Sequence, residues 1–415
     1  MAKVRTSVES RLAYLRRLAV VFAAEIRIMI VSELYQREMS AKQFYEEFGG
    51  GSISRVDRHF KKLVEHGWLR YIRSEGPGSH RRGGVEHFYR ATELAIFDNE
   101  TWALVPYSVR VAISWRTFKM LAERVREALK AKTLDARPEG DLNYTTMNLD
   151  QLGWDRIITE VDALFESIFE EQNDSRLRIS HTGEKPMAAT VALMAFESPA
   201  RPPVAPAERT TPVLVRALED CPIPFPQRVS RVFADELCLK ILAEANVREI
   251  SVPLFYAEFG GSIQVIRRRF KQLEERGWLL QVGEKTGGRR RSAHERFYRA
   301  AAPAMFDNES WAVIPQSIKP TFSWSVFRLL ADLAKEAIVA GTFEARLDNH
   351  LTWTVLWLDQ QGWENVARGI NRLSALVLKE KKRAKKHLAN SGEKPITTTV
   401  GLAAFESPRS AAKEP

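Results

Sequence analysis

Two segments of the chain, residues 52–65 and 262–275, carry side chains that suit contact with nucleic acid. Arginine can donate two parallel hydrogen bonds to the edge of a guanine, and glutamine can bond the edge of an adenine. The residues offered for this chemistry are Ser54, Arg55, Arg58, His59 and Lys62 in the first segment, and Gln264, Arg267, Arg268, Lys271 and Gln272 in the second. Such residues can read bases only if a rigid element presents them on one face.

Apolar spacing predicts that each segment is a helix. The apolar positions are Ile53, Val56, Phe60 and Leu63 in the first segment, and Ile263, Ile266, Phe270 and Leu273 in the second. This spacing places the apolar residues on one helical face, so we expect them to face inward and the basic and amide residues outward. Ser52 and Ser262 precede the helices as N-caps, where the backbone N–H groups of the first turn can hold a phosphate.

A hairpin is expected after each of these helices. Its strands are residues 68–74 and 85–91 in the first case, and 278–283 and 295–300 in the second. The connecting loops hold Arg81 and Arg82, and Arg289, Arg290 and Arg291. We expect these arginines to contact phosphates or a minor groove.

Both segments belong to one duplicated unit. The clearest matches are Phe44–Gly50 with Phe255–Gly261, Phe88–Ala91 with Phe297–Ala300, and Gly183–Pro186 with Gly392–Pro395. The separation is about 210 residues, which is far too long for the repeat of a solenoid. The 415 residues are therefore one multi-element unit used twice.

Three helices followed by a hairpin with a basic tip resemble the winged helix-turn-helix of ArsR-like and MarR-like bacterial transcription regulators. The resemblance covers about residues 15–92 and 228–301, and it combines element order, a Gly-Trp entry into the first strand and a basic wing. It implies a regulator that binds double-stranded DNA through a recognition helix and a wing. The alternative is a winged-helix module that binds protein and not DNA.

The second part of each unit is expected to join the two copies. A long helix there precedes a strand–helix–strand unit, with the strand at 351–357 and residues 142–148 opposite it. Such a sheet needs a cover, and the other copy can supply it, so we expect an α+β fold arranged as a pseudo-twofold intrachain dimer. The expected domains are 1–92 and 228–301 (winged helices), 93–199 and 302–408 (pairing domains), and 200–227 (a Pro-rich linker).

Charge is distributed unevenly between the copies. The chain has a net charge of +10, with 30 basic and 28 acidic residues in 1–207 against 32 and 24 in 208–415. Much of the second surplus lies in residues 379–386. A basic surplus favours a polyanionic partner. We therefore expect an imperfect palindrome as the DNA target, with the second winged helix binding more tightly.

Other classes of function find little support in the sequence. Two cysteines, Cys221 and Cys238, cannot form a disulfide framework or a four-ligand zinc site, which fits a cytoplasmic protein without a metal. No apolar run is long enough to span a membrane, so we expect no membrane partner. Asp98 and Glu100 are expected to lie in a turn that starts a helix, and not to be a catalytic pair. We expect no enzyme and no cofactor, whereas a small-molecule effector held among the tryptophans stays open.

Overall fold

The computed structural model describes residues 8–76, 85–137, 139–200, 235–286, 294–301 and 314–408. The arginines expected at the hairpin tips (Arg81, Arg82, Arg289, Arg290 and Arg291), most of the expected linker and Cys221 lie outside these ranges. The described residues form a mixed helix-and-sheet structure, as expected for the α+β class. No described helix is both long enough and apolar enough to cross a membrane.

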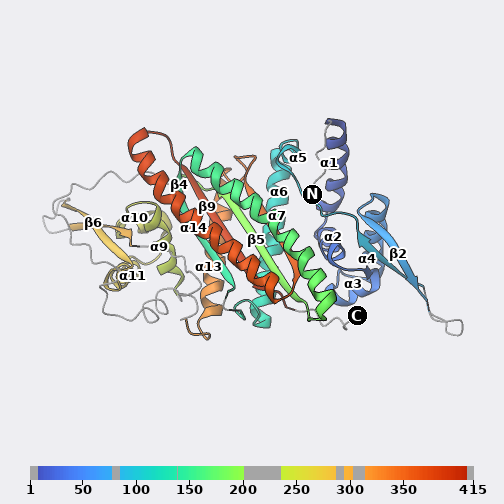
Figure 1. Ribbon diagram of the computed structural model, residues 1–415. Coiled ribbons are helices and arrows are strands. Elements are labelled where there is room, and N and C mark those ends of the chain that lie inside the picture. The colour runs from blue at the N-terminus through green and yellow to red at the C-terminus, as the bar shows by residue number, and fades with distance from the viewer. Residues whose placement is uncertain are drawn as a thin grey trace.

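Two similar groups of elements occur near the beginning and in the middle of the chain. Head 1 contains α1 (Val8–Phe22), α2 (Glu25–Gln36), β1 (Met39–Ser40), α3 (Ala41–Phe48), α4 (Ile53–Glu65), β2 (Leu69–Glu75) and β3 (Glu86–Ala91). Head 2 contains α9 (Glu236–Val247), α10 (Val252–Phe259), α11 (Ile263–Glu275), β6 (Leu279–Thr286) and β7 (His294–Ala300). The two heads lie at opposite ends of the molecule (Figure 1).

A four-stranded antiparallel sheet separates the heads. The first half of the chain contributes α5 (Asn99–Ala103), α6 (Tyr107–Ala131), β4 (Asp141–Leu149), α7 (Gln151–Thr182) and β5 (Met187–Glu197). The second half contributes α13 (Lys319–Ala340), β8 (His350–Leu358), α14 (Gln360–Ser391) and β9 (Ile396–Glu406). The strand order is β4-β9-β5-β8, so strands from the two halves alternate across the sheet.

The strand pairing differs from the sequence expectation in one respect. Strand β4 lies at one edge of the sheet and β8 at the other, so residues 142–148 do not lie opposite residues 351–357. Each edge strand pairs with a strand of the other half: Tyr144 is opposite Gly401, and Val191 is opposite Thr354. The hydrogen bonds of the sheet therefore tie the two halves together along its whole width.

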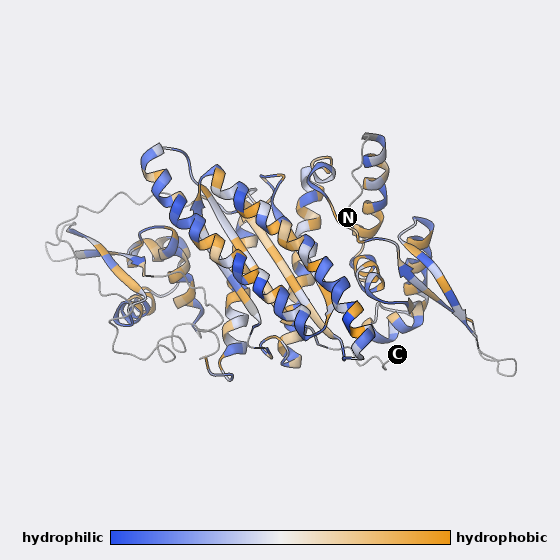
Figure 2. Cartoon of the chain, in the orientation of Figure 1, coloured by the Kyte–Doolittle hydropathy of each residue, from blue (hydrophilic) through white to orange (hydrophobic). Residues whose placement is uncertain are grey.

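The helices cover the sheet in two layers. Helices α7 and α14 pack side by side on one face, over a core that includes Leu193, Leu356 and Leu402. Helices α6 and α13 pack against the other face, which presents Met194 and Phe405. Figure 2 shows the hydrophobic residues gathered along the strands between these layers, with hydrophilic residues along α14. Because both faces are covered, most strand residues are buried, and these include the threonines Thr190, Thr354 and Thr399.

Recurring sequence motifs set the ends of the two 32-residue helices. Asp150 accepts a hydrogen bond from the backbone N–H of Gly153 at 2.8 Å, and Asp359 does the same with Gly362. These N-caps satisfy amides that a helix start leaves unpaired. At the other ends Gly183 and Gly392 adopt left-handed conformations, with φ of 68° and 69°. The Leu-Asp-Gln and Gly-Glu-Lys-Pro repeats are thus helix boundaries.

The heads join the sheet differently. The apolar core of head 2, including Leu239, is continuous with the residues of α13 and the sheet. The core of head 1 forms a separate cluster. Polar contacts join head 1 to the rest of the molecule: Arg124 of α6 donates to Glu33 at 3.0 Å, and Gln36 donates to the carbonyl of Val355 at 3.0 Å. Head 1 is thus joined by charge and hydrogen bonding, whereas head 2 shares an apolar core with α13 and the sheet and adds hydrogen bonds such as that from Asn246 to the carbonyl of Thr146, at 3.3 Å.

Two buried carboxylates also accept hydrogen bonds from residues of the other half of the chain. Glu344 accepts hydrogen bonds from Trp102 Nε1, at 3.1 Å, and from the Ser114 hydroxyl. Asp135 accepts a hydrogen bond from the Ser323 hydroxyl at 2.7 Å. Burial raises the pKa of both Glu344 and Asp135, because desolvation penalises the charged carboxylate.

Candidate nucleic-acid interface

Helix α4 starts from a glycine turn and packs one apolar stripe into head 1. Gly50 has φ of 113°, and a Cβ there would lie 2.6 Å from the Ile26 side chain, so this position requires glycine. The hydroxyl of Ser52 then caps the helix by accepting from the Arg55 N–H at 3.3 Å. Val56, Phe60 and Leu63 are buried, as the spacing predicts. The expectation that Ile53, in the first turn, also faces inward is wrong.

Ile53 and Ile263 do not face the core. Their exposed fractions are 45% and 38%, so no other element covers these two side chains. Exposure of a branched apolar side chain beside basic residues places methyl groups on the candidate contact surface. Apolar contact of this kind suits the methyl group of thymine.

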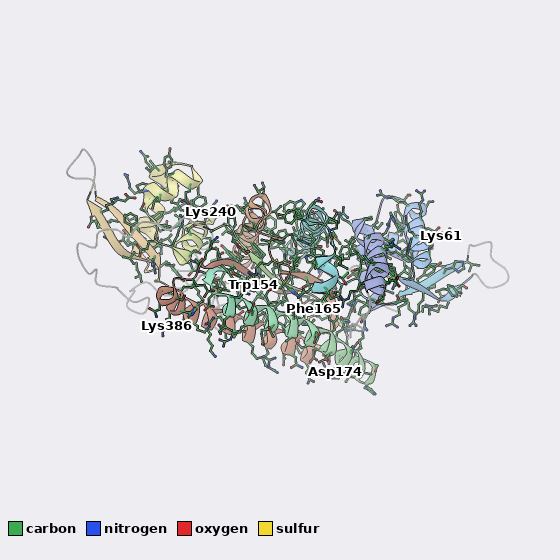
Figure 3. The ribbon with its side chains drawn as sticks, turned by 90° about the horizontal axis from the view of Figure 1, so that it is seen from above. Lys61, Trp154, Phe165, Asp174, Lys240 and Lys386 are labelled. Carbon is green, nitrogen blue, oxygen red and sulfur yellow. The ribbon has the colours of Figure 1, made fainter. Side chains whose placement is uncertain are left out.

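The basic residues of α4 point outward. Ser52, Ser54, Arg55, Arg58 and Lys62 are all exposed. Neither Arg55, Arg58 nor Lys62 forms an ion pair within the part of the chain that the structure describes. The acidic residue of this helix face, Asp57, is paired with Lys61 at 2.8 Å. Figure 3 shows Lys61 on the outer side of head 1. Three unpaired cations thus remain on α4.

The pKa of His59 reflects its burial and the charges on this surface. Its ring is partly buried, and Nδ1 accepts a hydrogen bond from Arg27 Nε at 3.1 Å. Burial lowers the pKa of His59, and the charges of Arg27, Arg55, Arg58 and Lys62 lower it further. The imidazole therefore lies among four positively charged side chains. Arg27 was not among the residues that helix spacing selected, because it comes from α2.

Helix α11 presents a comparable surface on head 2. Ser262, Gln264, Arg267, Arg268 and Lys271 are exposed. Arg267 and Arg268 form no ion pair among the described residues, whereas Lys271 lies 3.6 Å from Glu275. Gln272 is half-buried, and its side-chain oxygen accepts from Arg269 at 3.0 Å. Of the predicted α11 residues, Gln272 is thus the least available for an external contact.

The two helix starts are not equivalent. The Ser52 hydroxyl caps α4, but the Ser262 side chain makes no capping hydrogen bond at the start of α11. The hydroxyl of Ser262 is therefore not committed to the helix. Position 27 in head 1 is matched by Cys238 in head 2, so α11 also lacks the supporting arginine that contacts His59 in head 1.

The other residues that could have formed a functional site have structural roles. Asp98 accepts from the Thr101 N–H at 2.7 Å and caps α5, which is the turn that the sequence predicts. Cys238 is buried, and desolvation raises the pKa of its thiol to about 12, so the thiol is protonated at neutral pH. The described residues contain no group of three His, Cys, Asp or Glu side chains that could hold a metal. Trp154 and Trp363 are core residues under the helix layer.

The comparisons with known proteins found no relative. No protein-family model matches the chain, and no curated protein or solved structure matches it significantly.

Proposed function

We propose that the chain binds double-stranded DNA as a tandem winged helix-turn-helix regulator, with α4 and α11 as its recognition helices. One observation carries this proposal: two helices in matching positions expose arginines that have no ion-pair partner among the described residues. An uncompensated basic helix face is the electrostatic footprint of a nucleic-acid partner. The amide of Gln264 and the methyl groups of Ile53 add groups that can distinguish bases.

The arrangement of the halves supports a pseudo-twofold intrachain dimer. Exchanging the two halves converts the strand order β4-β9-β5-β8 into itself, read from the other edge. Helix α2 of head 1 packs beside edge strand β8, and α9 of head 2 packs beside edge strand β4. Two heads related in this way suit the two half-sites of an approximate palindrome. The halves differ in sequence, so the half-sites are expected to differ too.

A salt-dependent gel shift on genomic fragments tests the proposal against a protein-binding module. Neutralising phosphates releases counterions, so the slope of log K against log salt should be about −0.9 per phosphate contacted. The double variant Arg58→Ala/Arg268→Ala should lose both affinity and sequence preference. Exposed Lys130, on α6 and outside both heads, provides the control Lys130→Ala. Absence of any shift at low salt would favour the protein-binding alternative.

A further inference from the structure

The two heads are attached to the sheet at matching points. Gln36, the last residue of α2, donates to the carbonyl of Val355 in edge strand β8, at 3.0 Å. Asn246, the last residue but one of α9, donates to the carbonyl of Thr146 in edge strand β4, at 3.3 Å. Val355 and Thr146 occupy matching positions in the two halves. Both heads are therefore held at the C-terminal end of the helix that packs beside the sheet.

The N-terminal end of this helix is attached in head 2. Glu236, the first residue of α9, forms an ion pair with Arg328 of α13 at 3.0 Å. Leu239, one turn later, is buried in the apolar core that head 2 shares with α13. Figure 1 shows α9 beside α13. Head 2 is thus fixed at both ends of α9.

Head 1 carries the charges for the same attachment but does not make it. Glu25, the first residue of α2, and Lys119 of α6 occupy the positions of Glu236 and Arg328. Both side chains are exposed, and neither forms an ion pair among the residues that the structure describes. The complementary charges of this joint are therefore present in both halves of the chain but are paired in the second half alone.

The surface of α6 next to Lys119 is apolar and exposed. Val109 and Trp115 have exposed fractions of 45% and 39%. Their counterparts in the second half, Ile318 and Trp324, are half-buried and pack against the core that head 2 shares with α13. On the head 1 side Ile28 is half-buried, whereas its counterpart in head 2 is buried. The second half thus indicates that a docked head is what covers this surface.

Two arginines of α6 hold head 1 in its observed position. Arg116 donates to the carbonyl of Phe22, the last residue of α1, and Arg124 donates to Glu33 at 3.0 Å. The second half has a serine and a leucine at the positions of these arginines, so it offers neither guanidinium. Head 1 therefore has two sets of contacts open to it: those of its own arginines and those that head 2 uses.

We propose that head 1 has a second position, in which it turns about the end of α2 at Gln36 and docks on α6 as head 2 docks on α13. In this docked position Glu25 pairs with Lys119, and Ile28 and Trp115 become buried. The 12 residues of α2 form a lever of about 18 Å, so a rotation of about 15° moves Glu25 by about 5 Å. The same rotation turns α4 relative to α11. Head 1 thus alternates between two positions, whereas head 2 has one.

Distances between spin labels on the full chain test this inference. One pair of labels joins head 1 to α7, through Lys61→Cys and Glu170→Cys. The matched pair joins head 2 to α14, through Lys271→Cys and Lys379→Cys, and all four positions are exposed. Double electron–electron resonance should give two distances for the first pair and one distance for the second.

Three variants should shift the ratio of the two positions in stated directions. All carry Cys221→Ser, and Cys238 needs no replacement because it is buried. Arg116→Ser removes a contact of the observed position and should enrich the docked one. Lys119→Glu should reduce the docked fraction about two- to five-fold, the range for an exposed ion pair. Glu25→Lys/Lys119→Glu restores opposite charges and should recover the docked fraction.

Three results would overturn the second position. The first is a single distance for head 1 both in the labelled chain and in its Arg116→Ser variant. The second is a docked fraction that falls in Lys119→Glu and stays low in the double variant, because the ion pair would then have no part in docking. The third is a doubled mass in light scattering that Trp115→Glu abolishes, which would show that a second copy covers α6.

Circular dichroism confirms that each variant is folded. The label distances are measured without DNA, so their outcome is independent of the proposed function.

Discussion

Trp102 and Glu344 are 242 residues apart in the chain, yet the indole N–H of one donates to the buried carboxylate of the other at 3.1 Å. The Ser114 hydroxyl donates to the same carboxylate, and Arg110 lies 3.6 Å from it. All three partners come from the first half of the chain, whereas Glu344 comes from the second. This contact is thus one of the points at which the halves are fixed to each other.

Replacing Glu344 with alanine is expected to destabilise the protein by about 2–4 kcal/mol, because it leaves buried donors without an acceptor. Urea unfolding, followed by tryptophan fluorescence, measures the loss. Glu364, an exposed acid on α14, serves as the control, and Glu364→Ala should change stability by less than about 0.5 kcal/mol. Equal effects of the two substitutions would remove the structural role given to Glu344.

Removing the ion pair between Arg124 of α6 and Glu33 of α2 is expected to destabilise head 1 and not head 2. Arg124→Leu introduces the residue type that Leu333 supplies at the matching position in the second half. It leaves the buried Glu33 with Arg37 as its remaining cation, at 3.8 Å, and removing one partner of a buried pair costs about 3–5 kcal/mol. Hydrogen exchange in α2 should accelerate at least about ten-fold, while exchange in α9 stays unchanged.

Adding Glu33→Gln to Arg124→Leu gives the matched test of this explanation. The double variant carries no unpaired carboxylate at the junction, so most of the protection in α2 should return. Protection that stays low in the double variant would mean that Arg124 acts through packing and not through its charge.

DNA affinity is expected to depend on pH through His59. In the free protein its pKa is lowered by burial and by the neighbouring cations, so the imidazole is largely neutral near pH 7. A bound phosphate would raise that pKa, so binding takes up a proton and affinity should increase as pH falls from about 7.5 to 5.5. One group contributes at most about ten-fold per pH unit.

The variant His59→Gln should flatten this pH profile, as measured by fluorescence anisotropy with a labelled duplex. His181, exposed near the end of α7, provides the control substitution His181→Gln. A wild-type profile that is flat, or that rises with pH, would exclude His59 as a group that titrates on binding.

The two heads should contribute unequally to DNA affinity. Arg58→Ala and Arg268→Ala each remove one exposed arginine, and such a contact contributes about 1–3 kcal/mol when it reads a guanine. We expect the larger loss for Arg268→Ala, because the second half of the chain carries the greater basic surplus. Quantitative footprinting measures both half-sites. Equal losses would contradict the asymmetry, and protection of a single half-site would contradict the two-headed binding.

The sequence by itself determines most of the elements. The stripe of Val56, Phe60 and Leu63, the cap at Asp359 and the helix end at Gly392 follow from residues a few positions apart, and such local relations can be recognised in a sequence. Internal repetition adds a second instance of each. Ile53 fits the same stripe but is exposed, because spacing indicates the face of a residue and not whether another element covers it.

Only the tertiary structure decides what lies between the halves. The pairing of β4 with β9, the donors to Glu344 and the position of Arg27 beside His59 all join residues that are distant along the chain. The charges of Glu25 and Lys119 are visible in the sequence, but only the structure shows that no ion pair joins them among the described residues, whereas the matching pair of head 2 is formed. Local spacing fixes which face of an element is apolar, whereas the partner of that face is chosen by burial and hydrogen bonding across the whole fold.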